Sequence, residues 1–501
     1  MKKAISILLT LCMVFSCFSI GFADVDTTDT ETEKVCECEN IPIVYVAGFG
    51  AGLYLNPESD DRKAVYPPSA TDIISAIPAL LFAIIGVATG NEALFGKAAV
   101  NAANKLLSKL SCDDDGKPIY NTSIDPFEYP EYDIHQNVTN DIIDRSFDFE
   151  YDWRLSPLDN ADELKAFIDY VKELTGHSEI ALVCHSQGNT VVAAYLEEYG
   201  NGGIAKIAFL SPAYQGISIL GSLYRKEADI SGKADELFGF ITSVMGESGG
   251  TDAVSVLLKI LNTTGFTGGL LNFLQKYLSS QFDLIFSECL APAFGNLAGT
   301  WAFVPDEYFS DAVETMFSGR KDAPILEKIR YYHDNVQTKL PEIIQKTMDD
   351  GTDVIICAGY NISTIPVSLT PAVHSDFLID TEYMSIGATV APFGKTLGNN
   401  YKQSVDCGHD HVSDDMLVDA STGAFPEITW YFSGLSHAEF PEDYYIFLNR
   451  FLFSEKKMTV RTYEEYPQFM KKDKDGRLVP VEAEEESGKG IFGFLSSIFS
   501  F

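Results

Sequence analysis

The apolar positions of this chain form short buried runs that alternate with segments of helical periodicity. Asn160–Leu174 places its apolar residues at helical spacing, and a further helix is expected from Gly188 to about Tyr199. Apolar or β-branched runs of strand length occur before, between and after these helices, at Ile41–Ala47, Ser146–Asp152, Glu179–Cys184 and Ile204–Leu210. Strands that alternate with helices predict an α/β fold, with a mostly parallel sheet and helices on both faces.

Two long insertions are expected to interrupt this alternation. Residues 53–140 do not fit a strand–helix unit and contain the apolar run Ile73–Val87. Residues 216–350 are rich in apolar helical segments and are expected to form a cap over the sheet. The later core is expected to comprise a strand, a short hairpin arm, a last strand and a closing helix, at Val354–Ala358, Thr381–Val390, Glu427–Phe432 and Pro441–Phe453.

These patterns divide the 501-residue chain into six parts. They are a signal peptide at 1–23, an acidic linker at 24–40, a first core part at 41–215 with the insertion 53–140, a helical cap at 216–350, a second core part at 351–455 and a charged tail with an apolar end at 456–501. Residues 1–23 combine two lysines, an apolar stretch and a small-residue cleavage site, so a secreted or extracytoplasmic protein is expected. The tail is expected to be disordered.

The net charge limits the classes of partner that the chain can bind, and the cysteine content limits its disulfides. The net charge of −36 argues against nucleic acid, while 46% hydrophobic residues suffice for a large core. Seven cysteines follow the signal peptide, and the odd number leaves at least one thiol over. Cys184 and Cys357 are expected to be buried thiols, and export would permit a disulfide from Cys36 or Cys38 to Cys112.

The turn from Cys184 to Gly188 carries the strongest chemical signal. Its sequence, Cys-His-Ser-Gln-Gly, lies between a buried strand and a helix, as the nucleophile elbow of α/β-hydrolases does, with Cys in place of the first Gly. Ser186 is the expected nucleophile, and the Gln187 N–H is expected to bind the oxyanion. The glycine-rich loop after the first strand is expected to supply a second oxyanion donor, the Phe49 N–H.

A serine nucleophile needs a base and an acid, which in this fold follow it in the chain. His437 lies five residues after Phe432 in the last expected strand, which makes it the expected base. Asp414 is the preferred acid and Asp415 the alternative. Asp376 and Asp380 lie nearer the preceding strand and remain further candidates. No cofactor and no metal are expected, because His409-Asp410-His411 is interpreted as a solvated turn without a partner ligand.

Several short blocks of the chain form a recognisable set. They are Tyr151-Asp152-Trp153-Arg154, YVAGFGAGL, VCHSQG, NLAGTWAFVP (Asn296–Pro305), SDDML with Ser421, and LSHAEF. Together they resemble the lecithin:cholesterol acyltransferase-like group of α/β-hydrolases, and Tyr151–Arg154 is the most specific match. The chain departs from the family pattern at Ala47, Cys184 and Ser413. The resemblance implies a Ser186–Asp414–His437 triad with oxyanion amides at Phe49 and Gln187. Asp152 and Arg154 are expected to form a structural ion pair.

The expected function is a secreted serine hydrolase of lipid esters, either a lipase or phospholipase or an O-acyltransferase, working through an acyl-enzyme. The alternatives are a short-chain carboxylesterase or thioesterase, and a non-catalytic lipid- or surface-binding protein on a hydrolase scaffold. The expected partner is a lipid or other acyl ester. The apolar run Ile73–Val87 is expected either to be a buried or lid helix or to contact a membrane or micelle interface.

Overall fold

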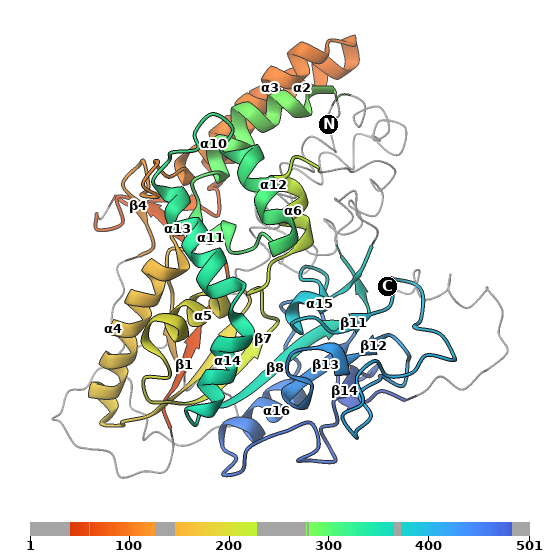
Figure 1. The fold of residues 1–501 in the computed structure, drawn as a ribbon. Coiled ribbons are helices and arrows are strands. Elements are labelled where there is room, and N and C mark those ends of the chain that lie inside the picture. The colour runs from red at the N-terminus through yellow and green to blue at the C-terminus, as the bar shows by residue number, and fades with distance from the viewer. Residues whose placement is uncertain are drawn as a thin grey trace.

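The structure, a computed structural model, describes residues 41–59, 61–125, 146–227, 277, 280–364 and 372–482 (Figure 1). The expected signal peptide, the acidic linker with Cys36 and Cys38, and the apolar end of the chain lie outside these residues. Most of the apolar helical segments expected between residues 228 and 279 lie outside them too.

An eight-stranded sheet forms the centre of the molecule. Its strand order is β15-β14-β13-β8-β7-β6-β1-β5, and neighbouring strands are parallel except β15, which runs antiparallel to β14. The strands are β1 (Ile43–Val46), β5 (Ser146–Phe149), β6 (Ile180–His185), β7 (Ile204–Leu210), β8 (Asp353–Tyr360), β13 (Thr429–Ser433), β14 (Phe469–Lys472) and β15 (Leu478–Pro480). The sheet confirms the predicted α/β-hydrolase architecture.

Helices pack on the sheet, and capping residues set the ends of one of them, α4. In α4 (Pro157–Thr175), the Ser156 side chain accepts from the Leu158 N–H and Gly176 ends the helix in the left-handed conformation. This helix packs against α5 (Gly188–Tyr199), which in turn contacts α14 (Leu340–Asp349). The helix α16 (Glu442–Leu452) covers β13, where Phe447 packs against Trp430 and Phe432.

The first insertion forms a small sheet and a helical hairpin. The sheet has the order β3-β2-β4, from β2 (Leu53–Leu55), β3 (Lys63–Tyr66) and β4 (Thr122–Ser123). The hairpin consists of α2 (Ala70–Thr89) and α3 (Glu92–Leu107), followed by η1 (Ser108–Leu110), and it lies at the end of the molecule away from α16 (Figure 1). Small residues bring its helices together, because Ala76 and Ala79 pack on Ala102.

The second insertion supplies helices above the carboxyl ends of the strands. They are α6 (Ser218–Tyr224), η3 (Phe286–Leu290), α10 (Ala291–Phe294), α11 (Ala298–Trp301), α12 (Asp306–Met316), α13 (Ile325–Tyr332) and η4 (His333–Gln337). Trp301 anchors them, because its ring packs on Tyr224, Phe309 and Phe317.

Two expectations for the later chain are wrong. Thr381–Val390 is not a hairpin: it contains α15 (Thr381–Met384) and β11 (Thr389–Val390), and β11 pairs with β12 (Val418–Asp419). The segment predicted as a disordered tail is ordered as far as residue 482, where β14 extends the sheet beside β13. The buried Met470 is followed by two lysines and only Phe469 is apolar beside it, so the short strand gives little hydrophobic signal.

Candidate active site

Ser186 lies in a strained turn between β6 and α5. Its φ of +53° is a left-handed conformation that residues other than glycine rarely adopt. The Ser186 N–H donates to the Leu210 carbonyl over 3.1 Å, and its own carbonyl accepts from the Asn189 side-chain amide over 2.8 Å. These bonds hold the turn in place. The Ser186 hydroxyl makes no hydrogen bond with any residue that the structure describes.

Glycines allow the first strand and its loop to approach this turn closely. A Cβ built at Gly188 would overlap the backbone carbonyl oxygens of Val46 and Ala47. A Cβ at Gly48 would lie 3.0 Å from the Cβ of Ser186. The loop that carries Phe49 therefore lies directly against the nucleophile turn, where the sequence predicts an oxyanion donor.

The Tyr-Asp-Trp-Arg motif fixes that loop from the other side. The Tyr151 hydroxyl donates to the Ala47 carbonyl over 3.0 Å, and the Trp153 indole N–H donates to the Ala51 carbonyl over 3.2 Å. The Phe49 ring packs on the Trp153 ring with centroids 4.2 Å apart. Both ends of the glycine-rich loop are thus held by one motif, which gives the motif a positioning role.

Asp152 and Arg154 form the expected ion pair. The side chains are 5% and 0% exposed, and Arg154 Nη2 lies 2.6 Å from Asp152 Oδ2. The Arg154 guanidinium also donates to the hydroxyl and the carbonyl oxygen of Thr122, each over 2.9 Å. The pair ties the first insertion to the core beneath the site, and a buried pair of this kind is costly to break on one side only.

The Gln187 side chain connects the nucleophile turn to the cap. Its amide N–H₂ donates to the carbonyl oxygens of Trp153 (2.9 Å) and Gly299 (3.3 Å). The Gly299 N–H donates to the Arg154 carbonyl over 3.0 Å, and a side chain at this glycine would overlap the Trp153 carbonyl. Ser186 is accordingly only 1% exposed beneath the cap.

His437 lies beside this turn and is paired with Asp376. Its Nδ1 is 2.7 Å from Asp376 Oδ2, with both side chains buried. The other Asp376 oxygen accepts from the N–H groups of Leu378 (3.0 Å) and Ile379 (2.8 Å). Burial alone would raise the pKa of Asp376, but the His437 imidazole and the two N–H groups hold it below its ordinary value.

His185 holds the His437 loop against the nucleophile turn. Its Nε2–H donates to the His437 carbonyl over 2.9 Å, and the two ring centroids are 4.9 Å apart. Burial, together with the nearby His437 ring, lowers the pKa of His185 to about 3. His185 is therefore a neutral donor at ordinary pH, a positioning role that its place beside the nucleophile did not suggest.

The structure does not place the preferred acid, Asp414, beside His437. Asp414 is exposed on a loop that approaches Arg461 and Pro480, and the carboxylate that contacts His437 belongs to Asp376. Asp415 accepts from the Tyr360 hydroxyl over 2.9 Å and does not replace Asp376. Within the SDDML loop, the Ser413 hydroxyl accepts from the Leu417 and Val418 N–H groups.

Asp380, the remaining candidate, has its own partner. It accepts from the N–H and the hydroxyl of Ser218, over 2.9 and 2.8 Å. Burial raises the pKa of Asp380 to about 6. One signal could have favoured Asp376 over Asp414 in the sequence: it follows the buried strand β8 more closely, and acids of this fold follow that strand.

The central parallel sheet and the serine turn after β6 define the chain as an α/β-hydrolase. Residues 142–247 match the family model described as lecithin:cholesterol acyltransferase, which confirms the resemblance over the segment that holds the Tyr-Asp-Trp-Arg motif and Ser186. A search of curated proteins found no match.

Proposed function

We propose that the chain is an exported serine hydrolase that acts on a lipid ester. The acyl group passes first from the ester to Ser186 and then to water or to an alcohol. One observation carries the proposal: the strained, buried Ser186 follows His185, which holds the His437 loop, and His437 Nδ1 contacts a buried carboxylate. The family match supports acyl-ester chemistry, because this family acts on lipid esters. The proposed triad is Ser186, His437 and Asp376.

In the proposed mechanism, Ser186 Oγ attacks the ester carbonyl carbon while His437 Nε2 takes the hydroxyl proton. Asp376 stays ionised, fixes the imidazole tautomer and stabilises the imidazolium. The Phe49 and Gln187 N–H groups are proposed to bind the oxyanion, and one such donor is worth about 3–4 kcal/mol. His437 then returns the proton to the leaving alcohol, and the acyl-enzyme transfers its acyl group to water or to an acceptor alcohol.

The apolar surface of α2 supports a lipid substrate. Ile74, Leu81, Phe82 and Ile85 are between 47% and 61% exposed, and their spacing places them on one face of the helix. Among the described residues, Thr71–Thr89 is the one helix that is long and apolar enough to cross a membrane. Because its other face packs on α3, we propose that α2 lies in a lipid interface and does not span it.

Export is proposed from the first 23 residues, whose two lysines, apolar stretch and small-residue site form a secretory signal. The location is therefore proposed to be secreted or extracytoplasmic.

Covalent labelling tests the proposal. The purified chain is expected to react with a fluorophosphonate at Ser186 and to hydrolyse nitrophenyl esters, with medium and long acyl chains preferred over short ones. Ser186→Ala should abolish both, while Ser287→Ala, a matched change at an exposed serine of the cap, should change neither. Equal turnover by the Ser186→Ala variant would refute the assignment.

The same experiment separates the alternatives. A preference for acetyl or butyryl esters would favour a short-chain esterase, and an unlabelled, inactive protein would favour a lipid-binding scaffold.

A further inference from the structure

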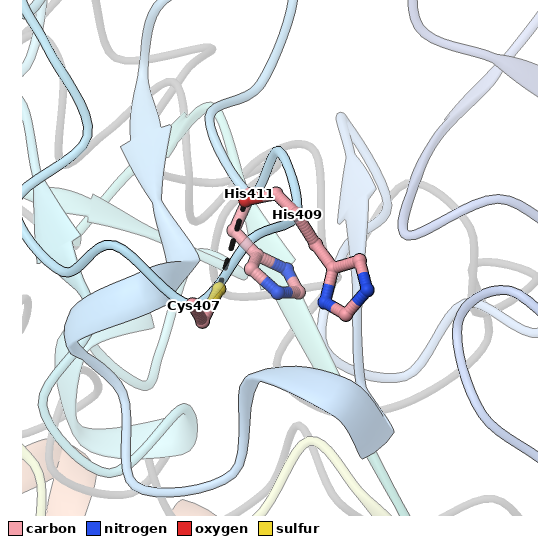
Figure 2. Close-up of side chains that lie close together, drawn as sticks. All are labelled: Cys407, His409 and His411. Atoms are coloured by element: carbon pink, nitrogen blue, oxygen red, sulfur yellow. Dashed lines mark hydrogen bonds between the residues drawn. The ribbon is translucent and has the colours of Figure 1, made fainter.

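Three potential metal ligands lie together on the loop between β11 and β12, remote from the serine turn. Cys407, His409 and His411 each offer one ligand atom, and these atoms lie within 4.8 Å of one another. Figure 2 shows the sulfur and the two imidazole rings gathered at one side of the loop. The chain bends at Gly408 and His409, and Gly408 has a φ of +79°, so the three side chains come from one short bent stretch of the loop.

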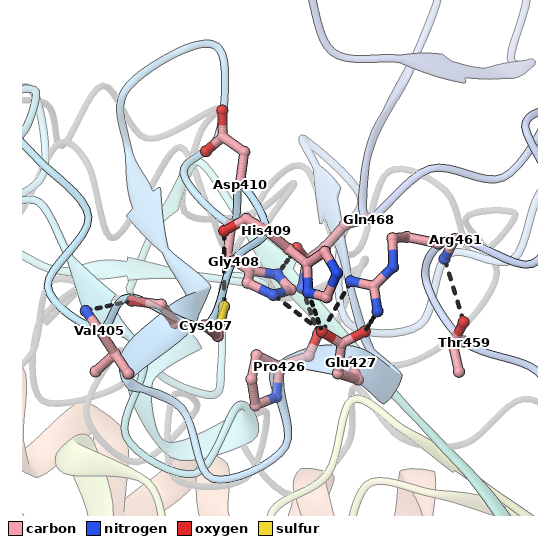
Figure 3. Close-up of polar contacts among 12 residues, drawn as sticks. Val405, Cys407, Gly408, His409, Asp410, Pro426, Glu427, Thr459, Arg461 and Gln468 are labelled. Carbon is pink, nitrogen blue, oxygen red and sulfur yellow. Dashed lines mark hydrogen bonds and ion pairs between the residues drawn. The ribbon is translucent and has the colours of Figure 1, made fainter.

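A fourth group comes from a distant part of the sequence. Glu427, in the short helix η6 (Pro426–Ile428) before β13, has its Oε1 3.3 Å from His409 Nδ1 (Figure 3). The same oxygen lies 3.3 Å from His411 Nε2. Ligand atoms around a tetrahedral zinc ion are about 3.3–3.7 Å apart, as bond lengths of about 2.0–2.3 Å require. Both distances from an imidazole nitrogen to Glu427 Oε1 already have that spacing.

The hydrogen bonds of His411 fix which nitrogen faces the cluster. The Gln468 amide N–H₂ donates to the carbonyls of Pro426 (2.7 Å) and Thr429 (3.1 Å), so its Oε1 faces His411. That oxygen accepts from His411 Nδ1–H over 2.7 Å. His411 Nε2 therefore points at the cluster, buried and without a hydrogen bond of good geometry. An imidazole with one nitrogen held by a second residue is the usual arrangement of a metal ligand.

Hydrogen bonds from the Gln403 side chain hold the loop in its conformation without a bound ion. The Gln403 side chain donates to the carbonyls of Val405 (2.7 Å) and His409 (2.9 Å) and accepts from the His411 N–H (2.7 Å). An open hollow of about 320 Å³, lined in part by His411, Arg461 and Gln468, lies beside this part of the loop.

We propose that Cys407, His409, His411 and Glu427 form a structural site for a zinc-like divalent cation. A thiolate with two imidazoles favours zinc over calcium or magnesium, which prefer oxygen ligands. Arg461 contacts both Glu427 oxygens, at 2.8 Å (Oε1) and 2.5 Å (Oε2), so the carboxylate can offer Oε1 to an ion and keep the second contact. Cys407 and Glu427 are the partners that the sequence did not indicate for the two histidines.

The position of the site indicates a stabilising role. Glu427 precedes β13 and Gln468 precedes β14, whereas His437 follows the opposite end of β13. The ion would clamp the loop to the starts of two adjacent strands. We therefore expect zinc to raise the melting temperature by about 3 °C or more and to leave ester hydrolysis at 25 °C unchanged.

Zinc binding to the full chain tests the site. The chelator-treated protein is dialysed against zinc with excess calcium, which occupies non-specific carboxylates of this acidic chain, and bound zinc is measured by mass spectrometry. One equivalent is expected for the wild type and for His177→Gln, a control histidine outside the cluster. Cys407→Ser and His409→Gln, both at exposed positions, should each weaken binding at least about tenfold. Undiminished binding in these variants, or none in the wild type, would overturn the proposal.

Thiol reactivity gives an independent measurement that needs no enzymatic activity. Zinc should slow alkylation of Cys407 by iodoacetamide at least about tenfold, and a chelator should restore the rate. Cobalt in place of zinc should give a thiolate charge-transfer band that Cys407→Ser removes. A Cys407 alkylation rate that does not depend on the metal would contradict the site, whatever the outcome of the esterase assays.

Discussion

Asp376 binds His437 twice, once through its backbone and once through its side chain. The Asp376 carbonyl accepts from the His437 N–H over 2.8 Å, and its carboxylate contacts His437 Nδ1 over 2.7 Å. The two residues are 61 positions apart in the chain. The backbone hydrogen bond holds the two loops together, which places the His437 imidazole in contact with the Asp376 carboxylate.

The first prediction separates the two acids. Asp376→Asn should lower kcat about 10⁴-fold, because an amide can stabilise the wrong imidazole tautomer and no longer balances the imidazolium charge. Asp414→Asn, the matched change at the exposed carboxylate, should leave kcat within about twofold of the wild type. Kinetics with a nitrophenyl ester provide the measurement. The reverse ranking would restore Asp414 as the acid.

The second prediction concerns the loop against the serine turn. A methyl group at Gly48 would press on the Ser186 Cβ at 3.0 Å and on His185 Nδ1 at 3.1 Å. Gly48→Ala should therefore lower kcat about 10²-fold, as displacement of the reacting groups does. Gly52→Ala in the same loop meets only the Tyr54 ring, which is partly exposed and can move, and should have little effect. Equal losses in both variants would contradict this account.

The third prediction is a pH dependence of stability caused by His185. Its pKa in the folded state is about 3, below the ordinary value of 6.5. Below pH 6.5 the His185 imidazole is therefore protonated in the unfolded chain but stays neutral in the folded chain. The free energy of unfolding consequently decreases as the pH falls below 6.5. His185→Gln keeps an N–H donor but cannot titrate.

Denaturant unfolding at pH 7.5 and at pH 5 measures this effect. The stability of the wild type relative to His185→Gln should fall by about 2 kcal/mol between these pH values. A constant difference would show that His185 is not held neutral by burial.

The fourth prediction concerns the exposed face of α2. Phe82→Ser with Ile85→Ser should weaken binding to lipid vesicles at least about tenfold, since each buried apolar side chain contributes about 1.5–3 kcal/mol. Hydrolysis of a soluble short-chain ester should not change. Ile119→Ser, a control at a residue that is 59% exposed outside α2, should bind vesicles as the wild type does. Vesicle sedimentation checks the result, and unaltered binding by the double variant would remove α2 from the interface.

Local patterns in the sequence sufficed for six of the eight strands of the sheet, β14 and β15 being missed, and for the serine turn and the position of His437. Buried strands such as β6 are continuous apolar runs, and the nucleophile turn follows one of them directly. Asp376 was only one of four acids, because the contact to His437 depends on how the loops after β8 and β13 fold over each other. The SDDML likeness favoured Asp414, which the structure places on the surface.

Polar contacts between residues far apart in the sequence could not be predicted for a related reason. Glu427 lies 16 or more residues from each histidine of the proposed metal site, and no periodicity joins them. The Gln187 contact to Gly299 likewise spans 112 positions. The pattern of apolar positions indicates which face of a helix or strand is buried. It does not indicate which side chain from a distant part of the sequence pairs with a given polar residue.

The place of β14 at the end of the sheet has a consequence for biosynthesis. Residues 469–471 pair with β13, so this side of the sheet cannot close until the chain has been synthesised past them. A chain that stops at residue 455 would leave β13, with its buried aromatic side chains, as an unpaired edge open to other chains. Such a truncated protein should accumulate as aggregates, although it retains Ser186, Asp376 and His437.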